Sequence, residues 1–125
     1  IKFIGSKGSN EIQELLQQSD VVVGTSLFSN VNNSIQEAMA FGRPVVAFNS
    51  GETSKLIRHM DNGMLVERGN IEAFSESLIK LYLDPALRKH LGKKGQETIL
   101  QTKSWVTRIK KELDIYESLA WMRRR

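Results

Sequence analysis

Cysteine is absent from the sequence, which also holds only two prolines and two histidines. Without cysteine there is no disulfide scaffold, no thiolate zinc site and no cysteine nucleophile, and this composition is typical of a reducing compartment. We therefore expect a cytoplasmic protein. Long apolar runs are missing as well, since none approaches the roughly 20 residues that cross a bilayer. The first residues also lack the basic and cleavage segments of a signal peptide.

Glycine-rich phosphate-binding fingerprints are also missing. No G-x-G-x-x-G follows an expected strand, and no G-x-x-x-x-G-K-S/T occurs, which argues against dinucleotide dehydrogenases and nucleoside triphosphatases. The two histidines, His59 and His90, are far apart in expected helices beside basic residues, so we expect both at the surface. The sequence therefore predicts no metal site and no catalytic triad.

The residues that are present suffice for one globular domain. At 125 residues and 40% hydrophobic composition, the chain can bury about two-thirds of its unfolded surface without help from a metal. We predict a single domain over residues 1–125. Because the sequence opens on an isoleucine inside an expected strand, we expect a fragment that lacks the first βα elements.

Positive charge is concentrated toward the C-terminal end. The net charge is +4, Arg88, Lys89, Lys93 and Lys94 lie close together, and residues 103–125 hold seven Lys or Arg against three acids. We expect residues 103–125 to form a basic amphipathic helix. Two interpretations stay open: a solvated helix face, or a surface for anionic lipid headgroups at the inner face of the membrane, worth about 1 kcal/mol per basic residue. No nucleic-acid partner is predicted.

Short apolar runs alternate with longer segments of helical period, which is typical of βαβ units and a parallel sheet. The expected strands cover residues 1–4, 20–23, 45–48 and 64–67, and the expected helices cover residues 11–18, 34–41, 54–59, 71–82, 85–100 and 105–122. Gly42 and Pro44 end the second helix, and Pro85 begins the fifth. The predicted fold class is α/β, a Rossmann-like parallel sheet flanked by helices.

Ligands of open parallel sheets bind beyond the carboxyl ends of the strands. Four loops follow expected strands, at residues 5–10, 24–33, 49–53 and 67–70. The second loop is the most informative, because it ends in three good helix N-caps, Asn32, Asn33 and Ser34. The unpaired backbone N–H groups and the positive dipole end of the following helix suit a phosphate.

Glu37 lies one turn inside this helix, on the same face as Asn33 and Ser34. A carboxylate at this position can accept hydrogen bonds from two sugar hydroxyls, and so can hold a ribose while the phosphates rest on the helix end. The alternative is an exposed helix residue without a ligand. Spacing alone favours that alternative.

One loop-helix-strand unit resembles the signature region of glycosyltransferase family 4. The unit is SLFSNVNNSIQEAMAFGRPVVAFNSG at residues 26–51, and the family follows roughly S-x-x-E-G-x-x-x-x-x-x-E-A-M-A-x-G-x-P-V-V-A. IKFIG resembles the strand ahead of the family's base-binding loop, and DNGMLVERGN resembles its N-G-x-L-V-x-x-G-D/N run. The family's closing helices are similar to LDPALRKHLGKKGQE and the Ser-Trp at 104–105. The resemblance covers nearly the whole chain, and its most specific part is the EAMAxGxPVVA match.

The resemblance implies a GT-B enzyme whose donor, a UDP- or GDP-linked sugar, is held mainly by this C-terminal domain. The acceptor, a glycan or a lipid-linked molecule, is held by an N-terminal domain absent here, so this chain alone is expected to be inactive. Glu37 matches the glutamate that binds the donor ribose. The other implied donor-binding residues approach the diphosphate, the sugar or the base, and they are Gly5, Ser6, Asn30, Val31, Asn32, Asn33 and Ser34.

The implied reaction is retaining and metal-independent, with cationic groups and helix-end amides stabilising the departing nucleoside diphosphate. Two positions depart from the family pattern. Ser29 stands where a glutamate contacts the transferred sugar, and Gly51, Glu52 and Lys55 stand where G-G-x-x-E is common. Two functions therefore stay open: half of a hexosyltransferase in polysaccharide assembly, or a catalytically degenerate nucleotide-binding or scaffold module.

Overall fold

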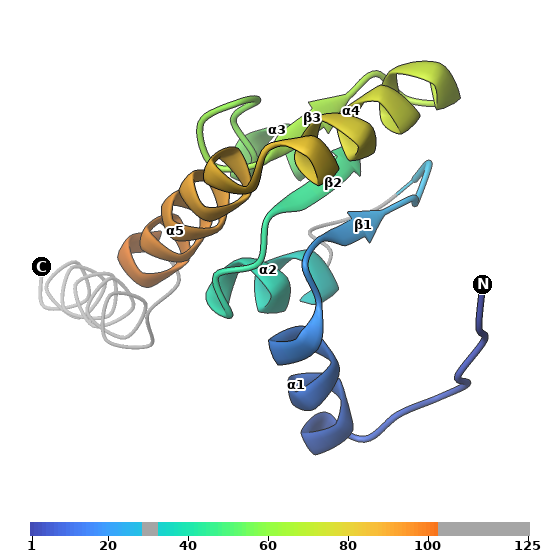
Figure 1. Ribbon diagram of the computed structural model, residues 1–125, viewed down its shortest axis with the longest axis vertical. Coiled ribbons are helices and arrows are strands. Elements are labelled where there is room, and N and C mark those ends of the chain that lie inside the picture. The colour runs from blue at the N-terminus through green and yellow to red at the C-terminus, as the bar shows by residue number, and fades with distance from the viewer. Residues whose placement is uncertain (29–32, 103–125) are drawn as a thin grey trace, which may run out of the picture.

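The computed structural model describes residues 1–28 and 33–102 (Figure 1). The elements in this part are α1 (Ser9–Gln18), β1 (Val22–Gly24), α2 (Asn33–Ala40), β2 (Val45–Phe48), α3 (Thr53–Leu56), β3 (Met64–Val66), α4 (Ile71–Leu83) and α5 (Pro85–Thr102). Three of the expected strands and five of the expected helices are confirmed with small shifts at their ends. The largest shift is at α3, which ends at Leu56 rather than at residue 59. The helices expected over residues 105–122 and 103–125 lie outside the described residues.

The three strands form a parallel sheet in the order β1-β2-β3. In the register, Val22 lies beside Val45, and Val46 lies beside Met64. Because all three strands run in one direction, their carboxyl ends lie at the same edge of the sheet. The structure thus confirms the predicted α/β fold with a parallel sheet.

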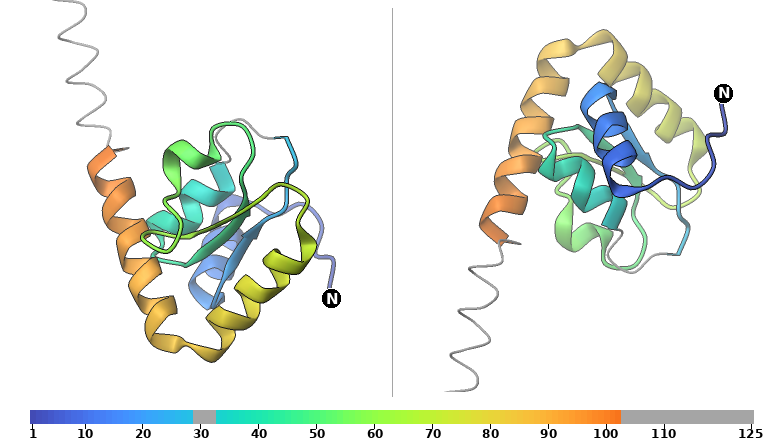
Figure 2. Two further views of the ribbon diagram at one scale, coloured as in Figure 1. Left: turned by 90° about the horizontal axis from the view of Figure 1, so that it is seen from above. Right: turned by 90° about the horizontal axis from the view of Figure 1, so that it is seen from below.

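Helices cover both faces of the sheet, as Figure 2 shows from two sides. Strand β2 is buried along its whole length, so its side chains alternate between two cores. Val45 and Ala47 pack with buried residues of α2, while Val46 and Phe48 pack with those of α4. Phe48 also stacks at a tilt on Phe74 of α4, with 4.7 Å between ring centroids. The domain is therefore a three-layer α/β/α arrangement.

The expected strand over residues 1–4 is wrong. These residues have no strand structure, and both Ile1 and Phe3 are almost fully exposed. A strand needs a neighbour for its backbone N–H and C=O groups, and within residues 1–28 and 33–102 the only strand paired with β1 is β2. Alternating apolar residues indicate which face of a strand could be buried, but they do not supply the neighbouring strand.

Gly42 terminates helix α2, as the sequence predicts, and the last helical residue is Ala40. The Gly42 N–H donates to the Met39 carbonyl at 2.9 Å, and the Arg43 N–H donates to the Ala38 carbonyl at 2.9 Å. This pair of bonds is a Schellman motif, and it requires a left-handed residue at Gly42, where φ is 68°. The chain then turns directly into β2, which fixes α2 against the sheet.

Helix α5 crosses the opposite edge of the sheet, where the strands begin. A Cβ atom at Gly92 would lie 2.2 Å from the Gly42 carbonyl oxygen and 3.5 Å from Pro44, just before β2. A Cβ atom at Gly95 would lie 3.2 Å from the carbonyl oxygen of Asn62, just before β3. These glycines let α5 pack closely against the residues just before β2 and β3. Helix α5 therefore covers the amino ends of these strands and not their carboxyl ends.

Candidate donor site

The loops that follow the three strands meet at the carboxyl edge of the sheet. The Ser50 hydroxyl, after β2, donates to the carbonyl of Ser26, after β1, at 3.0 Å. The guanidinium of Arg68, after β3, lies 5.0 Å from the ring centroid of Phe28, within the range of a cation–π contact. The structure thereby brings together the loops predicted at residues 24–33, 49–53 and 67–70.

Helix α2 begins at Asn33, immediately after the first of these loops. It packs against β1 and β2 through a buried stripe of Ile35, Ala38 and Met39, which has the spacing of one helix face. This packing directs the first turn of α2, with the positive end of its helix dipole, toward the carboxyl edge. Asn33 and Ser34 occupy this first turn, as expected.

Glu37 lines a cleft between α1 and α2. The cleft measures about 200 Å³ and is lined by Ser9, Ile12, Gln13, Leu16, Glu37 and Phe41. The Glu37 side chain is exposed, and in the part of the chain that the structure describes its carboxylate makes no hydrogen bond or ion pair. A carboxylate, a hydroxyl and an amide thus surround an apolar floor, a combination that can bind a sugar ring together with its hydroxyls.

The structure does not bring the other predicted donor residues into the Glu37 cleft. Gly5 and Ser6 lie in the exposed segment before α1 rather than in a loop after a strand. Ser29, Asn30, Val31 and Asn32 lie outside the described residues. The roles of all these residues stay predictions.

The first turn of α1, which borders the cleft, is held by a local ion pair. Lys7 Nζ lies 2.9 Å from Glu11 Oε1, and the Gly8 N–H donates to Glu11 Oε2 at 3.1 Å. The pKa of the Glu11 carboxyl lies below its ordinary value, mainly because of Lys7 and to a smaller extent because of the Gly8 N–H. This carboxylate is therefore already engaged, unlike that of Glu37.

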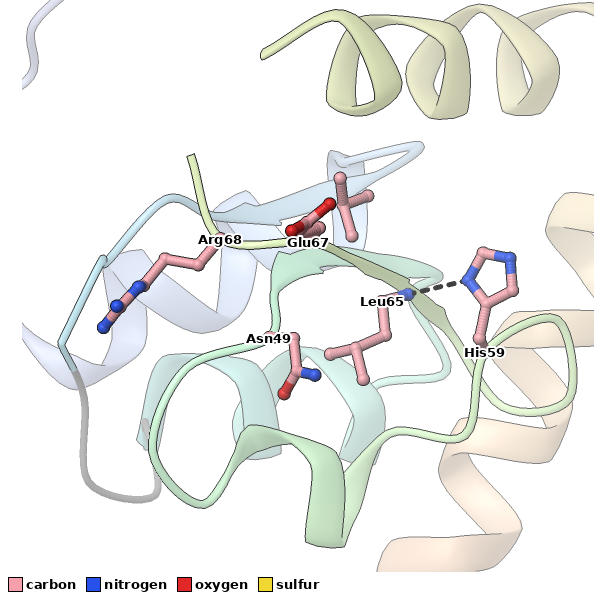
Figure 3. Close-up of a pocket in the computed structure, with 6 residues that line it drawn as sticks. Asn49, His59, Leu65, Glu67 and Arg68 are labelled. Carbon is pink, nitrogen blue, oxygen red and sulfur yellow. Dashed lines mark hydrogen bonds between the residues drawn. The ribbon is translucent and has the colours of Figure 1, made fainter. Parts of the chain in front are cut away.

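A second concavity, which was not predicted from the sequence, lies along the outer edge of β3 (Figure 3). It measures about 480 Å³ and is lined by Asn49, His59, Leu65, Val66, Glu67 and Arg68. His59 was expected inside a helix, but it follows α3, and its Nδ1 accepts a hydrogen bond from the Leu65 N–H at 3.1 Å. The imidazole thus accepts a hydrogen bond from a backbone N–H of β3. No local pattern in the sequence indicates this role.

The segment after β2 contains the second departure from the family pattern, at Gly51, Glu52 and Lys55. Lys55 Nζ lies 2.6 Å from Glu52 Oε2, so the only carboxylate of this loop is engaged by a neighbour three residues along. Thr53 is buried and donates to the carbonyl of Ser50 at 2.6 Å. The loop is therefore held by contacts of its own.

Two features are absent from residues 1–28 and 33–102. No group of three or more His, Asp or Glu side chains is placed to hold a metal ion. No helix within these ranges combines the length and apolar character that a membrane span requires. The metal-independent reaction stays a prediction.

Known proteins share both the sequence pattern and the fold. The family described as Glycosyl transferases group 1 matches residues 1–98. The putative glycosyltransferase EpsD of Bacillus subtilis is 31% identical over 109 residues, which are 87% of this chain and 28% of that protein. The chain thus spans little more than a quarter of this relative's length.

Solved glycosyltransferase structures are similar to this chain in fold. The C-terminal domain of the glycosyl transferase group 1 family protein LpcC from Francisella tularensis superposes with a TM-score of 0.74 at 28% identity, covering 84% of this chain and 53% of that one. Alr3699/HepE of Anabaena, solved in complex with UDP and glucose, gives a TM-score of 0.85 at 26% identity, covering 94% of this chain and 32% of that one.

The sheet, its flanking helices and these neighbours define a Rossmann-like domain of the kind that forms the C-terminal half of GT-B glycosyltransferases. With residues 1–98 matched, the chain belongs to the glycosyl transferases group 1 family.

Proposed function

We propose that this chain is the donor-binding half of a retaining glycosyltransferase. The whole enzyme moves a sugar from a UDP- or GDP-linked donor to a glycan or lipid-linked acceptor, which a further domain binds. Family membership supports the transferase class. The likeness to Alr3699/HepE, which holds UDP and glucose, supports a nucleotide-sugar donor.

A single observation carries the proposal: the carboxylate of Glu37 faces a cleft and has no partner among the described residues. In the proposed complex it accepts hydrogen bonds from both ribose hydroxyls. The diphosphate rests one turn away on the N–H groups at the start of α2. The base extends along the segment that contains Gly5 and Ser6.

The role of these groups in the reaction is electrostatic. When the sugar leaves the donor, negative charge develops on the diphosphate, and fixed amide dipoles stabilise that charge without reorganisation. We assign this role to the first turn of α2 and to the backbone of residues 30–33, with Ser29 beside the transferred sugar. The reaction proceeds without a metal, and this chain alone is inactive because it does not bind the acceptor.

The experiment is calorimetric titration of the 125-residue chain with UDP, GDP and ADP. Glu37→Gln keeps the shape of the side chain but removes its charge, so we expect binding to weaken by about tenfold or more. The matched control is Glu76→Gln on the exposed face of α4, which leaves affinity unchanged. Equal affinities in all three proteins would overturn the proposal.

A second candidate is a catalytically degenerate nucleotide-binding or scaffold module. It is favoured by the ion pair between Lys55 and Glu52, which engages the only carboxylate of the loop after β2, and by Ser29 at the sugar-contacting position. The discriminating assay measures donor consumption by the full-length protein and its Ser29→Glu variant. Consumption by the unmodified protein supports the enzyme, whereas a gain seen only in the variant supports the degenerate module.

We also propose a cytoplasmic location with peripheral attachment to the inner face of the membrane through residues 103–125. Their seven basic residues against three acids support attraction to anionic headgroups. Removing residues 103–125 is expected to weaken co-sedimentation with vesicles that contain phosphatidylglycerol. Undiminished co-sedimentation would contradict the attachment.

A further inference from the structure

A cavity lined by cationic side chains lies at the edge of the sheet opposite the proposed donor site. It measures about 520 Å³, and its charged and polar lining residues are Asp20, Arg43, Arg88, Lys89, Lys93 and Gln96. Four of these residues are cationic and one is acidic, which gives a formal charge of 4 − 1 = +3. We call this site the basic cavity.

Backbone carbonyls hold the two guanidiniums of the basic cavity in place. Arg43 Nη1 donates to the carbonyl of Ser19 at 3.1 Å. Arg88 Nη1 donates to the carbonyls of Leu81 and Tyr82 at 2.6 and 2.9 Å. These acceptors are neutral, so they fix the position of each guanidinium without neutralising its charge. In addition, Arg43 Nε is buried without a hydrogen-bond partner among the described residues.

The two lysines are also poorly neutralised. Lys89 and Lys93 lie four residues apart on α5 and therefore share one face of the helix. Within residues 1–28 and 33–102, Lys89 has no carboxylate partner, and the nearest partner of Lys93 is Glu97 at 4.0 Å. Like charges at this spacing repel each other, so the arrangement destabilises the helix unless an anion lies between them.

Donors already occupy the backbone carbonyls at the ends of the two helices beside the basic cavity, α2 and α4. The carbonyls of residues 37–40, at the end of α2, receive the N–H groups of Phe41, Gly42 and Arg43 and the side-chain amide of Gln96. Arg88 occupies the carbonyls at the end of α4. The start of α5 at Pro85 contributes the positive end of a helix dipole. Asp20 adds one carboxylate to the lining against four cationic side chains, so the basic cavity suits an anion better than a cation.

We propose that the basic cavity binds a phosphate-bearing ligand. Guanidiniums held in a fixed position pair well with phosphate oxygens, and two flexible lysines complete the charge around them. The phosphate comes either from a small soluble molecule or from the headgroup of an anionic lipid. The lining of this site shares only Phe41 with that of the donor cleft, and the proposal does not depend on the function proposed above.

The first test follows backbone amide shifts of the 125-residue chain by NMR during titration with inorganic pyrophosphate. Saturable shifts are expected at Gly42, Arg43 and Lys89. The variant Lys89→Gln with Lys93→Gln is expected to bind at least about tenfold more weakly at these amides. The control, Lys80→Gln with Lys94→Gln, changes the same charge on α4 and α5 outside the cavity lining and keeps the original affinity.

The second test is co-sedimentation with vesicles of phosphatidylcholine, alone or with phosphatidylglycerol. If the ligand is a lipid phosphate, the Lys89/Lys93 variant loses about thirtyfold in apparent affinity relative to the control. A loss with pyrophosphate alone identifies a soluble ligand, and a loss with vesicles alone identifies a lipid. If the variant and the control behave alike in both tests, the proposal is overturned.

Discussion

At the scale of single residues, Asn62 shows how a turn is fastened to the core. Its side chain is almost fully buried and fully bonded: Oδ1 accepts from the Arg58 N–H at 2.7 Å, and Nδ2 donates to the Leu56 carbonyl and to Thr98 Oγ1. These bonds connect the turn before β3 to α5. The sequence identifies a turn at Asp-Asn-Gly, but the pairing with Thr98 arises only from the fold.

Replacing Asn62 with alanine therefore leaves buried polar groups without partners. We expect Asn62→Ala to lower the free energy of unfolding by about 1–3 kcal/mol, measured by urea denaturation. Asn49→Ala is the matched control, because Asn49 is exposed and such a change stays within about 0.5 kcal/mol. Equal stabilities of the two variants would contradict the role given to Asn62.

Glu11 gives a residue-scale prediction about pH. Lys7 and the Gly8 N–H lower its pKa, so this carboxylate stabilises α1 above the unfolded-state pKa, and the contribution is lost as the pH falls through the folded-state pKa. Lys7→Ala is expected to raise the Glu11 pKa toward its ordinary value, as followed by NMR titration of the carboxyl carbon. Lys2→Ala serves as a control, and an unchanged pKa in Lys7→Ala would refute the assignment.

At the scale of elements, the contact between α5 and the end of α2 is set by glycine. A Cβ at Gly92 would lie 2.2 Å from the Gly42 carbonyl oxygen, so α5 must shift in Gly92→Ala. Overpacking of this kind costs about 1–3 kcal/mol, which exceeds the gain in helix propensity of about 1 kcal/mol. We expect a lower midpoint of urea denaturation.

The control for this contact is Gly8→Ala, where the nearest atom to an added Cβ is a flexible Glu11 oxygen at 3.8 Å. Its unfolding midpoint is expected to change little. A Gly92→Ala protein as stable as the original would show that α5 does not pack as closely as described.

The accuracy of sequence-based prediction also differs by element. The valines of β2 and the stripe Ile35, Ala38 and Met39 of α2 predict their elements correctly, because burial imposes their spacing. Residues 1–4 carry an equally regular pattern but no neighbouring strand, and they are exposed. The spacing of apolar residues thus predicts which face of a segment can be buried. Whether the segment is buried depends on its tertiary contacts.

At the scale of the whole molecule, the two edges of the sheet differ in character. The carboxyl edge gathers the three strand-following loops and the start of α2, while the opposite edge carries the basic cavity. The sequence proposes the first site only through the resemblance of residues 26–51 to a family signature, and the donor-binding role of Glu37 stays a prediction. It could not predict the second, since Arg43 joins Arg88, Lys89 and Lys93 only when α5 crosses the entrance of β2.

The most direct test of the donor site is a thermodynamic cycle that pairs Glu37→Gln with removal of a ribose hydroxyl. Calorimetry measures the affinities of the original chain and the variant for whichever of UDP or GDP binds, and for its 2′-deoxy analogue. If Glu37 holds the ribose, losing the hydroxyl weakens binding to the original chain by about tenfold and leaves binding to the variant nearly unchanged. Equal losses in both proteins would show that the carboxylate of Glu37 does not contact the sugar.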